Sequence, residues 1–154
     1  MKGTLIILSF LLTGLVYGQS KWYNEGAFPD SISSSETILV IVNNGDYDYN
    51  FLKKYMKRKT PNYKYEFVLK KNYTADGSYR YILEAVFEGE TENSRKHRAS
   101  NSDVHGNSAR YNYTVTFKDT TTSSNYIWKN KWSVATDEQS ILSKYINGLR
   151  KYLK

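Results

Sequence analysis

Apolar and polar residues alternate over four segments of the chain, which is the pattern of β-strands with one buried face. These segments span residues 63–70, 79–88, 110–118 and 126–132. Asp76-Gly77, between the first two segments, predicts a hairpin there. The residues expected on the apolar faces are Tyr63, Tyr65, Phe67 and Leu69; Tyr79, Tyr81, Leu83, Ala85 and Phe87; Tyr111, Tyr113, Val115 and Phe117; and Tyr126, Trp128 and Trp132.

Residues 37–42 have a different pattern, Thr-Ile-Leu-Val-Ile-Val, which is apolar on both alternations. Such a β-branched run is typical of a strand that is covered on both faces or central in its sheet. We therefore expect this segment to be the main core strand.

Two further segments have the period of amphipathic helices. The first begins after Asp46, a suitable N-cap, and stops at Pro61. Its apolar face is predicted to hold Phe51, Leu52, Tyr55 and Met56. The second opens at Thr136 with the spacing of a capping box. Its apolar stripe is predicted to hold Ile141, Leu142, Tyr145, Ile146, Leu149, Tyr152 and Leu153.

The pattern as a whole predicts an α+β fold. We expect a two-layer sandwich in which two helices cover one face of a mainly antiparallel five-stranded sheet, in the order βαββββα. The first crossover should be right-handed. The helices, around Phe51 and Leu149, should then bury Tyr65, Phe67, Tyr81, Leu83, Tyr113, Val115 and Trp128.

Residues 1–18 have the features of a secretory signal peptide. Lys2 precedes an apolar run from Leu5 to Val16, and Gly18 is the expected last residue before cleavage. The run is shorter than the ~20 residues that a membrane span requires, so cleavage is favoured over stable membrane insertion. We expect an exported protein, periplasmic or secreted, with an irregular arm over 19–36 and one domain over 37–154.

Composition removes several classes of site. The sequence contains no cysteine, which excludes a disulfide scaffold, a cysteine nucleophile and a thiolate metal site. No nucleophile elbow, phosphate-binding glycine loop, dinucleotide fingerprint or zinc-protease helix is present. The motifs therefore predict no cofactor, no metal site and no catalytic residue.

The polar segment 89–109 contains the remaining candidate catalytic residues. Both histidines, His97 and His105, lie there with Asp103, and their convergence with a strand carboxylate could serve a small extracytoplasmic hydrolase. Glu66 and Glu84, on separate predicted strands, could likewise flank a glycosidic bond. The alternative is a polar hairpin tip without a catalytic role.

The net charge is +7 at pH 7, which favours contact with anionic partners. The candidate polyanion-binding residues are Lys53, Lys57, Arg58, Arg95, Lys96 and Arg98. No exposed aromatic side chain is expected among them, so binding would be electrostatic and nucleic acid is not favoured. The alternative is a solvated surface that keeps the protein soluble.

The signal segment from Leu11 to Gln19, together with the Tyr/Lys/Asn-rich remainder, resembles small exported proteins of Bacteroidota. In element order, residues 37–71 are similar to the βαβ start of periplasmic envelope accessory domains related to the amino-terminal domain of TolB and to LpoB-like lipoproteins. The chain lacks the lipidated cysteine of those lipoproteins. The resemblance implies a non-enzymatic binding or accessory domain that contacts an envelope protein or an anionic polymer, and the hydrolase is the rival.

Overall fold

The computed structural model describes residues 26–43, 49–92, 94, 109–129 and 134–153. Its elements are β1 (Thr37–Val42), α2 (Asn50–Lys59), β2 (Lys64–Leu69), the 3₁₀ turn η2 (Lys70–Asn72), β3 (Tyr81–Glu90), β4 (Tyr111–Asp119), β5 (Ser124–Trp128), β6 (Val134–Ala135) and α4 (Glu138–Tyr152). The predicted signal peptide lies outside the described residues, as do Trp132 and the candidate residues Arg95, Lys96 and Arg98.

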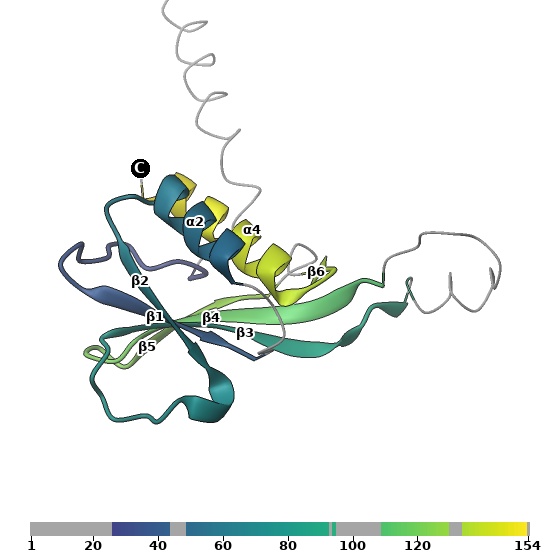
Figure 1. Cartoon of the computed structure of the whole chain (residues 1–154), viewed down its shortest axis with the longest axis horizontal. Coiled ribbons are helices and arrows are strands. Elements are labelled where there is room, and N and C mark those ends of the chain that lie inside the picture. Colours follow the sequence, from purple (N-terminus) through teal and green to yellow (C-terminus); the bar gives the residue numbers. More distant parts are fainter. Residues whose placement is uncertain (1–25, 44–48, 93, 95–108, 130–133, 154) are drawn as a thin grey trace, which may run out of the picture.

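The strands form one mixed sheet in the order β2-β1-β3-β4-β5, and β6 also pairs with β4. β1 is parallel to both of its neighbours, whereas β3, β4, β5 and β6 pair in antiparallel fashion. Both helices lie on the same face of this sheet (Figure 1). The predicted α+β class is therefore confirmed, with the short β6 added to the five predicted strands.

The predicted hairpin between β2 and β3 is wrong, because β1 lies between these two strands. β1 is apolar on both faces: Ile38 and Val40 belong to the core beneath the helices, while Leu39 and Ile41 are buried on the other face. A strand of this kind is most stable between two partners. The segment after β2 must therefore cross over β1, and it does so on the face opposite the helices (Figure 1).

The core lies between the sheet and the helix layer. From the sheet, Tyr81, Leu83, Tyr113, Val115 and Trp128 are buried, as predicted. Phe67 and Tyr65 are only partly buried because β2 is an edge strand. The residues that the helices contribute are Leu52, Met56, Ile141, Leu142, Tyr145, Ile146 and Leu149.

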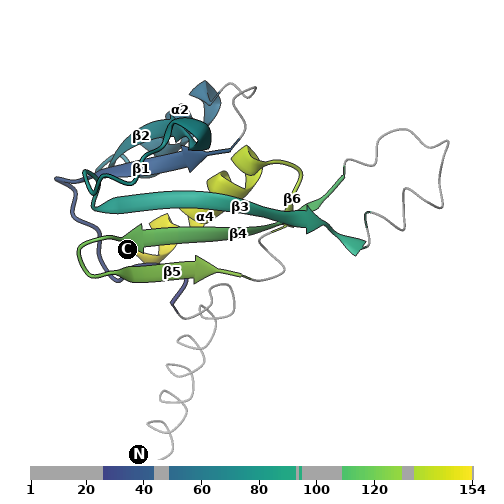
Figure 2. The same cartoon turned by 90° about the horizontal axis from the view of Figure 1, so that it is seen from below.

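Three aromatic residues predicted on apolar faces are exposed: Phe51, Phe87 and, near the end of α4, Tyr152. Phe51 is 64% exposed because Leu52 and Met56 occupy the centre of the α2 contact, and Phe51 lies one residue to the side of it. Phe87 is 56% exposed. It lies at an irregularity in the β3–β4 pairing, where the two strands extend past the helix layer (Figure 2).

The helix starts also differ from the prediction. Tyr49 occupies the N-cap position of α2, and the predicted cap, Asp46, lies outside the described residues. In α4 the cap is Asp137 rather than Thr136, since the Asp137 carboxylate accepts a hydrogen bond of 2.6 Å from the Ser140 backbone N–H. This is the more favourable choice electrostatically, because a carboxylate suits a helix N-terminus.

The described part of the N-terminal arm packs against the domain. Ala27, Phe28 and Ile32 are buried, and the Phe28 ring lies 4.9 Å from that of Tyr145, measured between centroids. The buried Tyr145 hydroxyl donates to the Ala27 carbonyl at 3.1 Å. The arm therefore belongs to the folded core over residues 26–36.

Candidate functional site

The most distinctive surface is the solvent side of α2, which carries five cations in ten residues. Lys53, Lys54, Lys57 and Arg58 are exposed and Lys59 is half-buried. None of them forms an ion pair with an acidic residue in the described part of the chain, where the ion pairs are Lys70–Glu84 and Arg80–Asp119. We call these five cations, together with Phe51 and Tyr55, the α2 surface.

In α2, like charges stand four residues apart, a spacing at which they repel each other. Lys53 and Lys57 are four residues apart, as are Lys54 and Arg58, and such pairs cost a helix about 0.2–0.5 kcal/mol each. The helix dipole favours Lys57, Arg58 and Lys59 in the last turn, but its effect does not reach Lys53 and Lys54. Helix stability alone therefore does not explain this charge pattern.

Aromatic rings lie among these cations, contrary to the prediction from sequence. The exposed Phe51 ring stacks on Tyr55 with 6.3 Å between centroids. Arg58 and Lys59 lie over the Tyr55 ring, at 5.9 Å and 5.7 Å from its centroid. The α2 surface can thus offer both cations and an aromatic face to a ligand.

The underside of α2 is held by contacts that fix the orientation of this surface. Leu52 and Met56 are fully buried. At the end of the helix, the Thr60 hydroxyl donates to the Met56 carbonyl at 2.9 Å and bonds the Tyr65 hydroxyl of β2 at 2.7 Å. Burial raises the pKa of Tyr65 to about 12, against the smaller lowering by Thr60, so this hydroxyl stays protonated at neutral pH.

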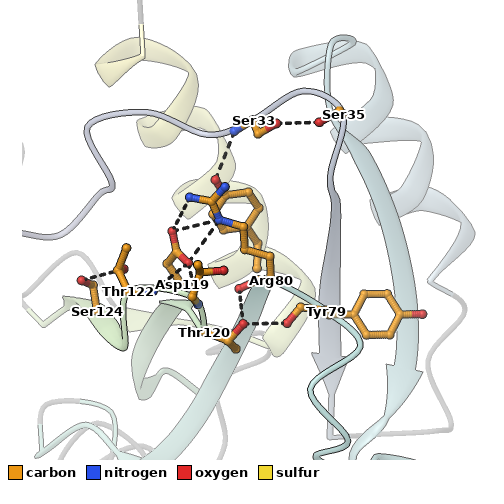
Figure 3. A network of polar contacts seen from close by, with 10 residues as sticks. Ser33, Ser35, Tyr79, Arg80, Asp119, Thr120, Thr122 and Ser124 are labelled. Atoms are coloured by element: carbon orange, nitrogen blue, oxygen red, sulfur yellow. Dashed lines mark hydrogen bonds and ion pairs between the residues drawn. The ribbon is translucent and has the colours of Figure 1, made fainter.

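A polar cluster at the start of β3 is built around an ion pair between Arg80 and Asp119. The Arg80 guanidinium donates to both Asp119 carboxylate oxygens, and Asp119 also accepts from the Thr121 backbone N–H (Figure 3). Burial works against ionisation of Asp119, but the Arg80 and backbone hydrogen bonds outweigh it and hold the carboxyl pKa below its ordinary value. The nearby Tyr81 hydroxyl accepts from the Ser33 backbone N–H at 3.2 Å. This cluster joins the strands and the arm.

A buried carboxylate, Glu138, lies at the start of α4. It accepts hydrogen bonds from the Asn43 backbone N–H at 3.0 Å, from the Asn43 amide at 2.9 Å and from the Tyr49 hydroxyl at 2.9 Å. The Asn43 amide also donates to the Ala85 carbonyl. Glu138 therefore connects the end of β1 with the starts of both helices, and its partners account for its burial.

The predicted catalytic alternatives find no support in the described residues. His97, Asp103 and His105 all lie outside them. Glu66 of β2 pairs with Leu39, and Glu84 of β3 pairs with Ile41. The two glutamates therefore lie on opposite sides of β1. Strand spacing then puts their Cα atoms roughly 12 Å apart. Glu84 is also paired with Lys70 at 2.6 Å.

Metal sites and membrane spans are absent from the same residues. No group of three or more histidine, aspartate or glutamate side chains converges on a metal-sized space within the described ranges. In those ranges, no helix combines the length and apolar character of a membrane span.

No protein-family model and no curated protein matches the sequence. Among solved structures, the chain is similar to a PelC dodecamer from Paraburkholderia phytofirmans. The two share 10% sequence identity at a TM-score of 0.40, and the match covers 82% of this chain and 92% of that one.

Proposed function

We propose that this chain is an exported, non-enzymatic binding domain of the cell envelope whose α2 surface holds an anionic polymer. The observation that carries the proposal is the α2 charge pattern. Five cations with no described acidic partner are kept on one short, firmly anchored helix despite their mutual repulsion. A polyanion would relieve that repulsion on binding.

The expected mode of binding is electrostatic with an aromatic contribution. Lysine and arginine neutralise anionic groups along a polymer and release its counterions, so affinity should fall steeply with salt. Phe51 and Tyr55 add an apolar face beside the cations. A polymer of acidic sugars offers carboxylates and apolar ring faces together, and so suits this surface.

The test uses alginate, a carboxylate-bearing polysaccharide, with neutral dextran as the comparison polymer. The triple variant Lys53→Gln, Lys57→Gln, Arg58→Gln should bind alginate at least about tenfold more weakly than the natural chain, since each lost charge contact adds to the effect. The slope of log affinity against log salt concentration should also flatten. Dextran should bind neither protein.

The matched control removes three exposed cations elsewhere, by Lys71→Gln, Lys118→Gln and Lys151→Gln. It changes net charge by the same amount and should retain most of the alginate affinity. If both triple variants lose affinity equally, binding depends only on net charge and the α2 site is wrong. Salt-insensitive binding, or no binding at low salt, would also refute the proposal.

A further inference from the structure

The segment between β2 and β3 forms a second feature, on the opposite face of the sheet. We call residues 70–80 the strap, because they connect β2 to β3 across β1. Several of its residues line a hollow together with Leu39, which is only 2% exposed. Two adjoining hollows of about 290 Å³ and 200 Å³ lie along the strap. Tyr73, Asp76 and Tyr79 line both of them.

Hydrogen bonds shape the strap before any ligand arrives. The Asp76 carboxylate accepts from the Ser78 backbone N–H and hydroxyl, at 2.9 Å and 2.6 Å. Gly77 has φ +77°, a conformation that glycine adopts without strain. Beyond the turn, the Thr120 hydroxyl donates to the Tyr79 carbonyl at 3.0 Å. Because these bonds already order the strap, it loses little conformational entropy when a ligand binds.

The Tyr79 side chain points away from the Arg80–Asp119 cluster and toward β1 and β2 (Figure 3), where it lines the larger hollow with Leu39 and Glu66. Interaction of its hydroxyl with the Glu66 carboxylate raises the Tyr79 pKa. Both side chains line the hollow, and the Glu66 carboxylate offers acceptor positions to a ligand.

The lining of the larger hollow combines three kinds of group. Leu39 and Val68 provide an apolar floor, two tyrosines provide aromatic rings, and the polar rim contains Glu66, Asn72, Thr74 and Ser78. The volume of about 290 Å³ is close to the lower limit of small-molecule sites, ~300 Å³.

This chemistry discriminates among ligands. Glu66 and Asp76 repel anions, and an apolar ligand would leave the polar rim without partners. A simple amine would use the carboxylates but not the Asn72 amide or the hydroxyls. A pyranose has hydroxyl donors for the carboxylate, acceptors for the amide and hydroxyls, and an apolar ring face for a tyrosine.

The geometry points to a binding site for one neutral pyranose residue in the larger hollow, with Glu66 accepting from its hydroxyls and Tyr73 or Tyr79 packing on its ring. This site is independent of the α2 surface, which lies on the other face of the sheet (Figure 1). Its ligand is uncharged, so its binding should respond little to salt.

The test titrates the isotope-labelled protein with the methyl pyranosides of glucose, galactose and mannose, and separately with the diamine cadaverine. At least one pyranoside should shift the backbone amides of Tyr73, Asp76 and Tyr79 in a saturable manner. Glu66→Gln should weaken that binding by about tenfold, because it removes a charge-assisted hydrogen bond. Tyr79→Phe should weaken it as well, since it removes a hydroxyl group from the lining of the hollow.

Glu88→Gln is the matched control: this carboxylate lies on β3, accepts a hydrogen bond from the Thr114 hydroxyl and lines neither hollow. It should leave pyranoside affinity unchanged. The inference is overturned if no pyranoside shifts the strap amides, if cadaverine binds there and the pyranosides do not, or if Glu88→Gln weakens binding as much as Glu66→Gln does.

Discussion

Phe51 and Leu52 are neighbours in the chain with opposite environments, since Leu52 is fully buried and Phe51 is 64% exposed. Leu52→Ala should destabilise the protein by about 2–5 kcal/mol through the cavity it leaves. Phe51→Ala should leave the free energy of unfolding nearly unchanged and should weaken alginate binding.

Urea denaturation of both variants, together with alginate titration, checks this pair. Leu52→Ala is the control for stability, and Lys118→Ala, at an exposed position on β4, is the control for binding. A large loss of stability in Phe51→Ala would mean that this ring is part of the core and is not available to a ligand.

Asp119 should make the stability of the fold depend on pH. Its pKa in the folded protein is below the ordinary value of 3.8, so its ionised form stabilises the fold at pH values above 3.8. That contribution is lost as the pH falls through the lower folded-state pKa. Asp119→Asn should therefore lower the melting temperature at neutral pH, and the difference from the natural chain should shrink in strong acid.

Thermal unfolding of the two proteins over a series of pH values measures this difference. A melting-temperature gap that stays constant from neutral pH into strong acid would show that the Asp119 charge contributes nothing. The Asp119→Asn variant would then be less stable for another reason, such as the loss of hydrogen bonds to the turn.

At the scale of elements, the N-terminal arm completes the helix layer. Phe28 is 2% exposed and contacts Tyr145, so Phe28→Ala should cost about 3–5 kcal/mol. Tyr145→Phe removes only the bond to the Ala27 carbonyl and should cost about 0.5–1.5 kcal/mol. Urea denaturation checks both values, and two unchanged midpoints would mean that the arm is detached in solution.

Local patterns predicted most elements because burial on one face leaves a period in the sequence. The alternation in β3 and β4 identified Leu83, Val115 and Phe117 as inward-facing residues, and the structure confirms them as fully buried. The pairing of strands is a long-range property that local patterns do not contain. The sequence of Asp76-Gly77 therefore predicts a hairpin, whereas in the structure these residues lie in the strap. The capping residue of α4 was misplaced by one position because Thr136 and Asp137 are both good caps.

The candidate sites were predictable to different degrees. The cations of α2 are visible in the sequence, but the exposure of Phe51 depends on which way the helix faces its neighbours. The hollow under the strap could not be foreseen, since Leu39, Glu66 and Tyr79 meet there only when β1 lies between β2 and β3.

At the scale of the whole molecule, the two sheet faces differ in chemistry. The helix layer carries the cationic α2 surface, and the opposite face carries the strap with its carboxylates and tyrosines. A polysaccharide with both charged and neutral sugars could be held at both faces. The two binding tests, one sensitive to salt and one not, separate these contributions.

Export is the second prediction at this scale. The protein collected from outside the cytoplasm should begin at Gln19, because Val16 and Gly18 set the cleavage position after the apolar run. Intact-mass measurement of the exported protein checks this. A product that retains residues 5–16 would show an uncleaved anchor and would contradict a soluble binding domain.

The most direct measurement is a map of the polymer contact on the protein itself. Backbone amide shifts of the isotope-labelled chain are recorded during titration with short alginate oligomers at low salt. The account predicts that the largest shifts fall within α2 (Asn50–Lys59), and that they disappear when salt is added. Shifts confined to the strap or to β5, or shifts on α2 that persist at high salt, would contradict the claim that the α2 surface binds an anionic polymer.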